Sequence, residues 1–227
     1  MELENPDPAQ VTREEVAALV EEVHRQGYRV AAHCEGLEGT QIAIEEGVDT
    51  IEHGFQAHRR PDLLAQLASY GGVLVPTLSF LVGVADRRAG EWSTHLVERS
   101  AYNVAEATQT LRAALAAGVP IAMGFDSSPE ERAASELGLM VDAGMSTTEA
   151  LVAATSVGAR AIGLDHLIGT VEPGKLAISW SSMVTPSKSS GSWSTPTAFT
   201  SCFRSACRSE ARPSTPGHSE PTDGRGG

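Results

Sequence analysis

Short, almost wholly apolar runs alternate along the sequence with longer segments of helical periodicity. The apolar runs are YRVAAH (28–33), VDTIEH (48–53), VLVPT (73–77) and VPIAMGFD (119–126). Buried strands that alternate with amphipathic helices predict an α/β fold with a parallel sheet, either a (β/α)8 barrel or a doubly wound sheet. Because a barrel needs eight strands, four strands indicate either an open sheet or one part of a barrel.

The helical segments carry recognisable end signals. Thr12 followed by Glu15 is a capping-box pattern, and Ser146 followed by Glu149 is a second one. Glycines are expected to end several helices because they adopt the left-handed conformation common after a last helical turn. Helices are therefore predicted over 12–26, up to Gly47, from Pro61 to Gly71, over about 92–117, and in two segments after residue 126, the second beginning at Ser146.

The composition changes near residue 177. Of the 50 residues in 178–227, 29 are Ser, Thr, Pro or Gly, types that favour turns and solvated chain. We predict a folded segment, 1–177, followed by a disordered tail, 178–227. The tail carries five basic and three acidic residues, whereas residues 1–177 carry 12 basic and 26 acidic residues.

The acidic folded segment argues against two classes of partner. Without a cluster of Lys and Arg it gains little from neutralising phosphates, so we expect no binding to nucleic acid or to anionic membranes. No apolar run reaches the roughly 18 residues of a membrane span, and the first ten residues lack the pattern of a signal peptide. The three cysteines, Cys34, Cys202 and Cys207, do not suggest a disulfide framework. We expect a soluble cytoplasmic protein.

Four polar residues fall at the carboxyl ends of the predicted strands: His33, His53, Thr77 and Asp126. The carboxyl ends of parallel strands meet at one edge of a sheet, where active sites of α/β proteins form. Imidazole and carboxylate groups are good ligands for zinc. The residues alone leave two interpretations open, a metal site or separate structural histidines with a helix-capping aspartate.

Side-chain alternation bears on the neighbours of these histidines. If His33 points into the site, Cys34 points away from it, so we expect a small buried thiol. The same alternation argues against Glu52 sharing a face with His53. The other histidines, His24, His58, His95 and His166, are expected at the surface.

Six motifs resemble the amidohydrolase superfamily in content and order: VAAHCEG, GVDTIEHG, LVPTLS, AGVPIAMGFDSS, MSTTEALVAATSVGARAIGL and IGTVEPGKLA. The resemblance is nearest to imidazolonepropionase-like and Xaa-Pro dipeptidase-like metal-dependent hydrolases, and it covers roughly residues 10–177. It implies the carboxyl-terminal half of a (β/α)8 TIM barrel, containing strands five to eight.

The resemblance also implies a catalytic site. His33 and His53 would be metal ligands on strands five and six, and Asp126 would be both a ligand and the general acid/base. The implied cofactor is one or two divalent ions, expected to be zinc. The implied reaction is hydrolysis of a C–N bond in a small amide, lactam or Xaa-Pro dipeptide by metal-activated water. Thr77 is expected to line the substrate pocket.

Two features of the family are missing from the sequence. There is no His-x-His pair, and the only lysines, Lys175 and Lys188, lie far past the position of strand four. The resemblance therefore implies a chain that lacks the amino-terminal half of the barrel. Alternatives are a non-catalytic half-barrel, or another chemistry of the superfamily such as deamination, lactone hydrolysis or phosphotriester hydrolysis. Exposed sheet edges would favour self-association.

The tail departs from the family directly after EPGKLA. Relatives continue with a strand such as Asp-Leu-Val-Val-Val-Asp-Gly-Asp-Pro, whereas this chain reads ISWSSMVTP (178–186). Codons compatible with these nine residues encode the family strand when one nucleotide is restored in front of them. We hypothesise that the tail is translated out of frame.

Overall fold

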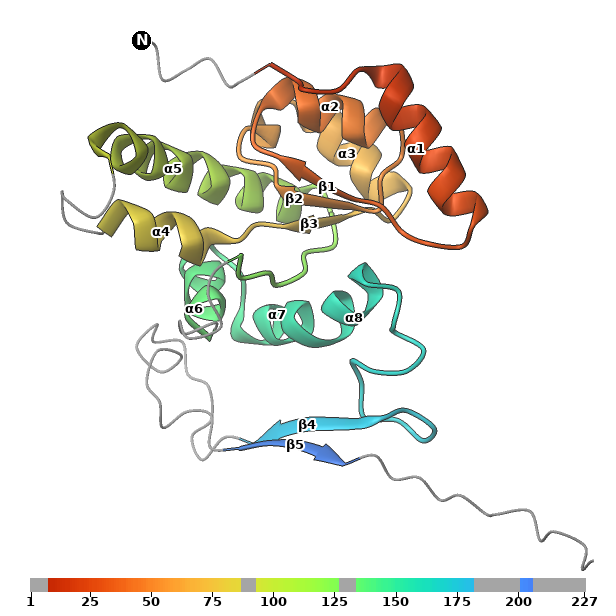
Figure 1. Cartoon of the computed structure of the whole chain (residues 1–227). Coiled ribbons are helices and arrows are strands. Elements are labelled where there is room, and N and C mark those ends of the chain that lie inside the picture. Colours follow the sequence, from red (N-terminus) through yellow and green to blue (C-terminus); the bar gives the residue numbers. More distant parts are fainter. Residues whose placement is uncertain (1–7, 87–92, 127–133, 182–200, 206–227) are drawn as a thin grey trace, which may run out of the picture.

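The protein is described by a computed structural model that covers residues 8–86, 93–126, 134–181 and 201–205 (Figure 1). Its centre is a parallel sheet in the order β1-β2-β3. The strands are β1 (Ala31–Cys34), β2 (Thr50–His53) and β3 (Val73–Val75). Register pairs Ile51 with Leu74, and a single parallel bridge joins Leu74 to Ile121. The fourth predicted strand is therefore a short bridge, although its chain still runs parallel beside β3.

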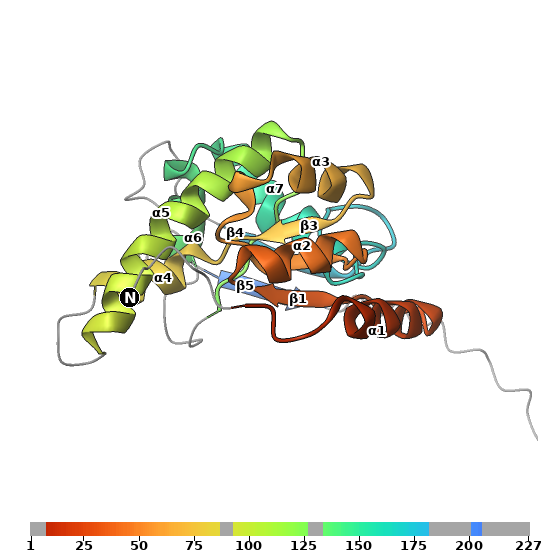
Figure 2. The same cartoon turned by 90° about the horizontal axis from the view of Figure 1, so that it is seen from above.

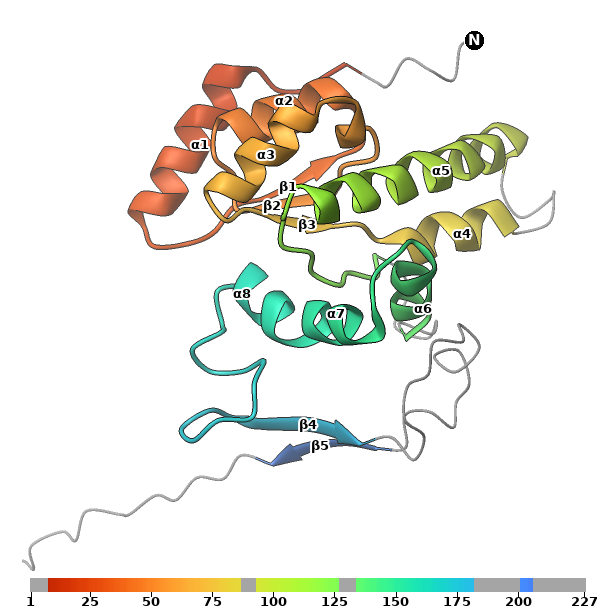
Figure 3. The same cartoon turned by 180° about the vertical axis from the view of Figure 1, so that it is seen from behind.

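Helices cover one face of this sheet (Figures 1 and 3). Ile51, Leu74 and Ile121 are cross-strand neighbours, and they belong to one apolar core together with Leu63 and Leu111 from the covering helices. Figure 2 shows α1 beside β1. The helices are α1 (Arg13–Arg25), α2 (Leu37–Glu45), α3 (Pro61–Ser69) and α5 (Thr94–Ala116), and a 3-10 turn, η1 (Ala57–Arg59), precedes α3.

A second helical segment covers the opposite face of the sheet. It consists of α7 (Thr147–Val152), a π-helical turn, η2 (Ala153–Val157), and α8 (Gly158–Ala161). Val157 and Ala161 pack against strand residues on this opposite face of the sheet, including Val73. The carbonyl of Ala153 accepts a hydrogen bond of 3.1 Å from the amide of Met123. The π turn thus supplies an acceptor to the last strand-like segment of the sheet.

The two predicted capping boxes are confirmed. Thr12 accepts from the amide of Glu15, whose carboxylate accepts in return from the amide of Thr12. Ser146 and Glu149 make the same reciprocal pair at the start of α7. Each pair satisfies two amides that the first helical turn leaves without partners.

Helix α4 (Leu78–Asp86) was not predicted from the sequence. Its sequence, LSFLVGVAD, is nearly all apolar and contains a glycine, so it lacks the polar stripe that marks an amphipathic helix. Buried side chains at Leu78, Leu81 and Val84 recur at helical spacing. The helix packs against α5 and α6 (Ala134–Asp142), and tertiary contacts therefore determine its conformation.

Part of the tail differs from the predicted disorder. β4 (Ala177–Ser181) and β5 (Ser201–Ser205) form an antiparallel pair. Ile178, Trp180 and Phe203 in these strands are of types with high strand propensity. The remaining tail positions lie outside the described residues, so the division of the chain at residue 177 stays a prediction.

We expect Leu111→Ala to lower the free energy of unfolding by about 2 to 5 kcal/mol, because the leucine is 0% exposed and its removal leaves a cavity in the core. Gln109→Ala, at an exposed position of the same helix, should change it by less than about 0.5 kcal/mol. Urea unfolding monitored by circular dichroism measures both. Equal effects would contradict the assignment of Leu111 to the core.

Candidate functional site

The predicted site residues at the ends of the second, third and fourth strand segments share an unusual backbone conformation. Among the described residues, the non-glycine positions with positive φ are His53 at 69°, Thr77 at 49° and Asp126 at 51°. This conformation is uncommon outside glycine, particularly for a β-branched residue such as threonine, and costs on the order of 1 to 3 kcal/mol. Such strain clusters at functional sites, and here it coincides with the residues singled out from the sequence.

The left-handed backbone of His53 redirects its side chain. Register pairs His53 with Cys34, which is buried in the core, so a regular strand would send the imidazole to the core side. Instead the His53 ring lies 4.6 Å from the His33 ring, centroid to centroid. The strand end therefore brings together two imidazoles that simple alternation would place on opposite faces.

His53 is the centre of the site. Its Nε2 atom lies 2.9 Å from Nδ1 of His33, and its Nδ1 atom lies 2.6 Å from the hydroxyl of Thr77. Oδ2 of Asp126 lies 3.8 Å from the same Nε2. The His53 side chain is 7% exposed, whereas that of Asp126 is 52% exposed. The buried imidazole of His53 thus lies next to two solvent-exposed side chains, His33 and Asp126.

The surroundings of His53 favour its neutral form. Burial lowers the pKa of its imidazole, and the neighbouring His33 lowers it further. When Nδ1 carries the proton and donates to Thr77, the lone pair of Nε2 points toward His33 and Asp126. Neutral imidazole with a free ring nitrogen is the form that binds metal ions.

The donor atoms fit a divalent ion in chemistry and approximately in spacing. Two ligands of a tetrahedral zinc ion lie roughly 3.3 Å apart, given bonds of about 2.0 to 2.1 Å. The separations of 2.9 and 3.8 Å around Nε2 of His53 bracket that value. Within the described ranges, however, no group of three or more His, Cys, Asp or Glu side chains is arranged to hold a metal ion. His33 and Asp126 would have to adjust to share an ion.

Cys34 lies in the core, as predicted. It is buried, and burial raises the pKa of its thiol to about 12. A thiol of this pKa stays protonated near neutral pH, and the thiolate is the form that binds metals. Cys34 therefore does not add a ligand to the site.

The expectation that Glu52 does not share a face of the sheet with His53 was wrong. Register pairs Glu52 with His33, and cross-strand partners share a face of the sheet. Burial raises the pKa of the Glu52 carboxyl, and the charge of Asp126 raises it further. Glu52 therefore faces the site, because the irregular backbone of His53 removes the alternation on which the expectation relied.

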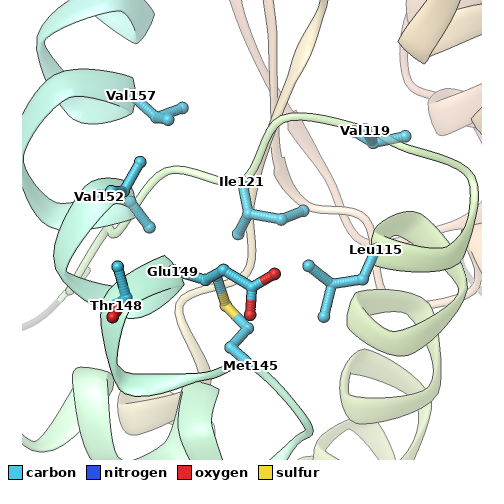
Figure 4. Close-up of a pocket in the computed structure, with 9 residues that line it drawn as sticks. Leu115, Val119, Ile121, Met145, Thr148, Glu149, Val152 and Val157 are labelled. Carbon is cyan, nitrogen blue, oxygen red and sulfur yellow. The ribbon is translucent and has the colours of Figure 1, made fainter.

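Two hollows lie near these elements, and His53, Thr77 and Asp126 line neither of them. One, of about 480 Å³, runs along β1 beside α1 and includes His33 and Glu35 in its lining. The other, of about 190 Å³, lies between α5 and α7 against Val119 and Ile121 (Figure 4). The second hollow is at the opposite end of the 119–126 segment from Asp126, so it is separate from the candidate site.

We expect His53 to titrate below its ordinary pKa of about 6.5 in the metal-free protein. The unfolded chain then binds a proton at this position before the folded chain does. The contribution of His53 to the free energy of unfolding should therefore fall as the pH is lowered through about 6.5. Proton NMR of the ring, assigned with His53→Gln, measures the midpoint, and a midpoint at or above 6.5 would contradict this burial effect.

Comparison with known proteins shows the family to which the chain is related. Residues 1–181 match the Amidohydrolase family. Ochratoxinase from Aspergillus niger is 34% identical over 165 residues, which are 70% of this chain and 33% of that protein. Imidazolonepropionase from Geobacillus kaustophilus is 28% identical over 178 residues, which are 73% of this chain and 36% of that protein.

Solved structures have the same architecture. The crystal structure of A. niger ochratoxinase aligns with a TM-score of 0.76 at 28% identity, over 88% of this chain and 46% of that one. A Xaa-Pro dipeptidase with methionine bound in its active site aligns with a TM-score of 0.71 at 31% identity, over 78% of this chain and 44% of that one. The chain thus spans less than half of these structures and about a third of the curated relatives. Because the family match covers most of the sequence, this protein belongs to the amidohydrolase family.

Proposed function

We propose that the chain carries part of the active site of a metal-dependent hydrolase that cleaves a C–N bond. In this proposal His33 and His53 are metal ligands, and Asp126 is both a ligand and the general acid/base. The observation that supports it best is that Nδ1 of His33 and Oδ2 of Asp126 both lie close to Nε2 of His53, at 2.9 and 3.8 Å. Family membership supports hydrolase chemistry at this place in the fold.

The residues have distinct roles in this proposal. A zinc ion held here would supply a water molecule of lowered pKa and would polarise the substrate carbonyl. Asp126, which is half exposed, can reach both that water and a bound substrate. Its carboxylate accepts a proton from the attacking water and returns it to the leaving nitrogen. His53, which is buried and neutral, fixes the position of the ligand cluster.

The proposed substrates are small amides or dipeptide-like molecules. The relatives include an imidazolonepropionase and a Xaa-Pro dipeptidase, whose names indicate cyclic amides and dipeptides with proline. Within the barrel, we propose that β1, β2, β3 and the 119–126 segment correspond to strands five to eight. The share of each solved relative that the chain covers, 46% and 44%, is consistent with a half-barrel.

A second candidate is a half-barrel without catalytic activity. It is favoured by the absence, within the described residues, of an assembled group of three metal ligands. An ion held by three ligands on an open sheet binds more weakly than one held by a full, supported set.

We expect weak zinc binding at one site per chain, measured by isothermal titration calorimetry. His53→Ala and His33→Ala should each lower the affinity at least about tenfold, because each removes a ligand. His95→Ala is the matched control, since His95 is exposed at the start of α5. Equal zinc affinities in all three variants would contradict the assignment of His33 and His53 as ligands.

We also expect slow hydrolysis of Xaa-Pro dipeptides or N-acyl amino acids in the presence of zinc. Asp126→Asn should lower the rate about 100-fold or more, because an amide cannot act as the acid/base. Release of free amine, followed by mass spectrometry, measures the rate. Hydrolysis unchanged in Asp126→Asn would contradict the role of Asp126. Zinc binding without turnover of any substrate would favour the non-catalytic half-barrel.

A further inference from the structure

Glu136 is a buried carboxylate that no part of the proposed reaction uses. It lies in the first turn of α6 and is 0% exposed. Burial raises the pKa of its carboxyl, which reflects the cost of keeping a charge away from water. A buried carboxylate persists where fixed donors compensate for this cost, so its donors indicate what it does.

The donors are the first amides of α4. The two oxygens of Glu136 accept hydrogen bonds of 2.8 Å from the amide of Leu78 and 2.7 Å from the amide of Ser79. These amides would otherwise lack partners, because the first turn of a helix has no preceding carbonyls to bond. The positive end of the helix dipole also stabilises a carboxylate there. Glu136 thus ties α6 to the start of α4.

The amide of Leu78 belongs to the peptide unit that follows Thr77. Holding this amide fixes the peptide plane after Thr77, a buried residue in the left-handed conformation. The backbone of Gly124 packs closely against this residue, because a Cβ added at Gly124 would lie 3.1 Å from Cγ2 of Thr77 and 2.4 Å from Cγ1 of Val75. Glu136 therefore holds the backbone that follows Thr77, and Gly124 lies against its methyl group.

The Thr77 hydroxyl lies 2.6 Å from Nδ1 of His53. A group that bonds the distal nitrogen of a ligand histidine sets which nitrogen carries the proton and how the ring is turned. We propose that Glu136 is a positioning residue: by holding the turn at Thr77, it fixes the tautomer and orientation of the His53 ring. The relevance of this role to catalysis rests on the proposed function. The effect of Glu136 on the His53 ring is independent of that function.

The test compares four variants in the metal-free protein by 15N NMR of the His53 ring, which distinguishes the two tautomers. Glu136→Gln keeps the size of the side chain but opposes one backbone amide with another N–H group. Thr77→Val keeps the shape and removes the hydroxyl, whereas Thr77→Ser restores a hydroxyl. Met140→Ala is the matched control, because Met140 is 0% exposed in the same helix and belongs to the core.

We expect Glu136→Gln and Thr77→Val to shift the His53 ring signals in the same direction and to weaken zinc binding about 10- to 100-fold. Thr77→Ser should retain the signals of the unmodified protein. Met140→Ala should lower the melting temperature and leave the ring signals unchanged. If Glu136→Gln does not fold, Glu136→Asp replaces it in the test. This variant keeps the charge but shortens the side chain by one methylene, and it should shift the His53 ring signals as well.

Two results would overturn the inference. One is a folded Glu136 variant with unchanged His53 signals, and the other is a shift of equal size in Met140→Ala, which would mark the effect as general destabilisation. The zinc measurement separates this inference from the proposed function. Shifted ring signals in a protein that binds no zinc would support the positioning role and contradict the metal-dependent reaction.

Discussion

The left-handed backbone at the end of β2 is the constraint on which the candidate site depends. Ile51 belongs to the core, and in a regular strand a residue two positions later would point to the same side. The φ of 69° at His53 breaks this rule at the last residue of the strand. The imidazole consequently meets His33 on the other face, next to Glu52, which pairs with His33 in the register. One unusual torsion angle thus joins residues from two strands into a single cluster.

The surrounding structure compensates for the strained residues. After His53, the amide of Gly54 donates to the carbonyl of Cys34 at 2.8 Å and prolongs the pairing of the two strands. After Thr77, two consecutive amides are held by the buried Glu136. Backbone strain of on the order of 1 to 3 kcal/mol per residue persists only where neighbouring contacts fix it in this way. Position at a strand end is therefore not sufficient to form the site, and specific partners are also required.

The sequence predicted the parts of this protein that follow from local chemistry. The alternation of apolar runs with amphipathic helices, and the reciprocal caps at Thr12 and Ser146, depend on nearby residues and were found where expected. The missed features depend on distant contacts. Helix α4 has no polar stripe of its own, and Glu136 bonds amides 57 and 58 positions away. Glu52 was misplaced because alternation fails where φ turns positive.

The candidate site combines a fixed part with a less constrained part, and this division bears on how it would hold an ion. His53 is buried and bonded through Nδ1 to Thr77, whose own turn is held by Glu136. His33 has a side chain that is 69% exposed, and its Nε2 atom lies 3.8 Å from Oε1 of Glu35. Asp126 likewise faces solvent. A ligand that must be immobilised on binding lowers the affinity by the conformational entropy that it loses. Tight binding would therefore require further ligands or contacts that hold His33 and Asp126 as firmly as Thr77 holds His53.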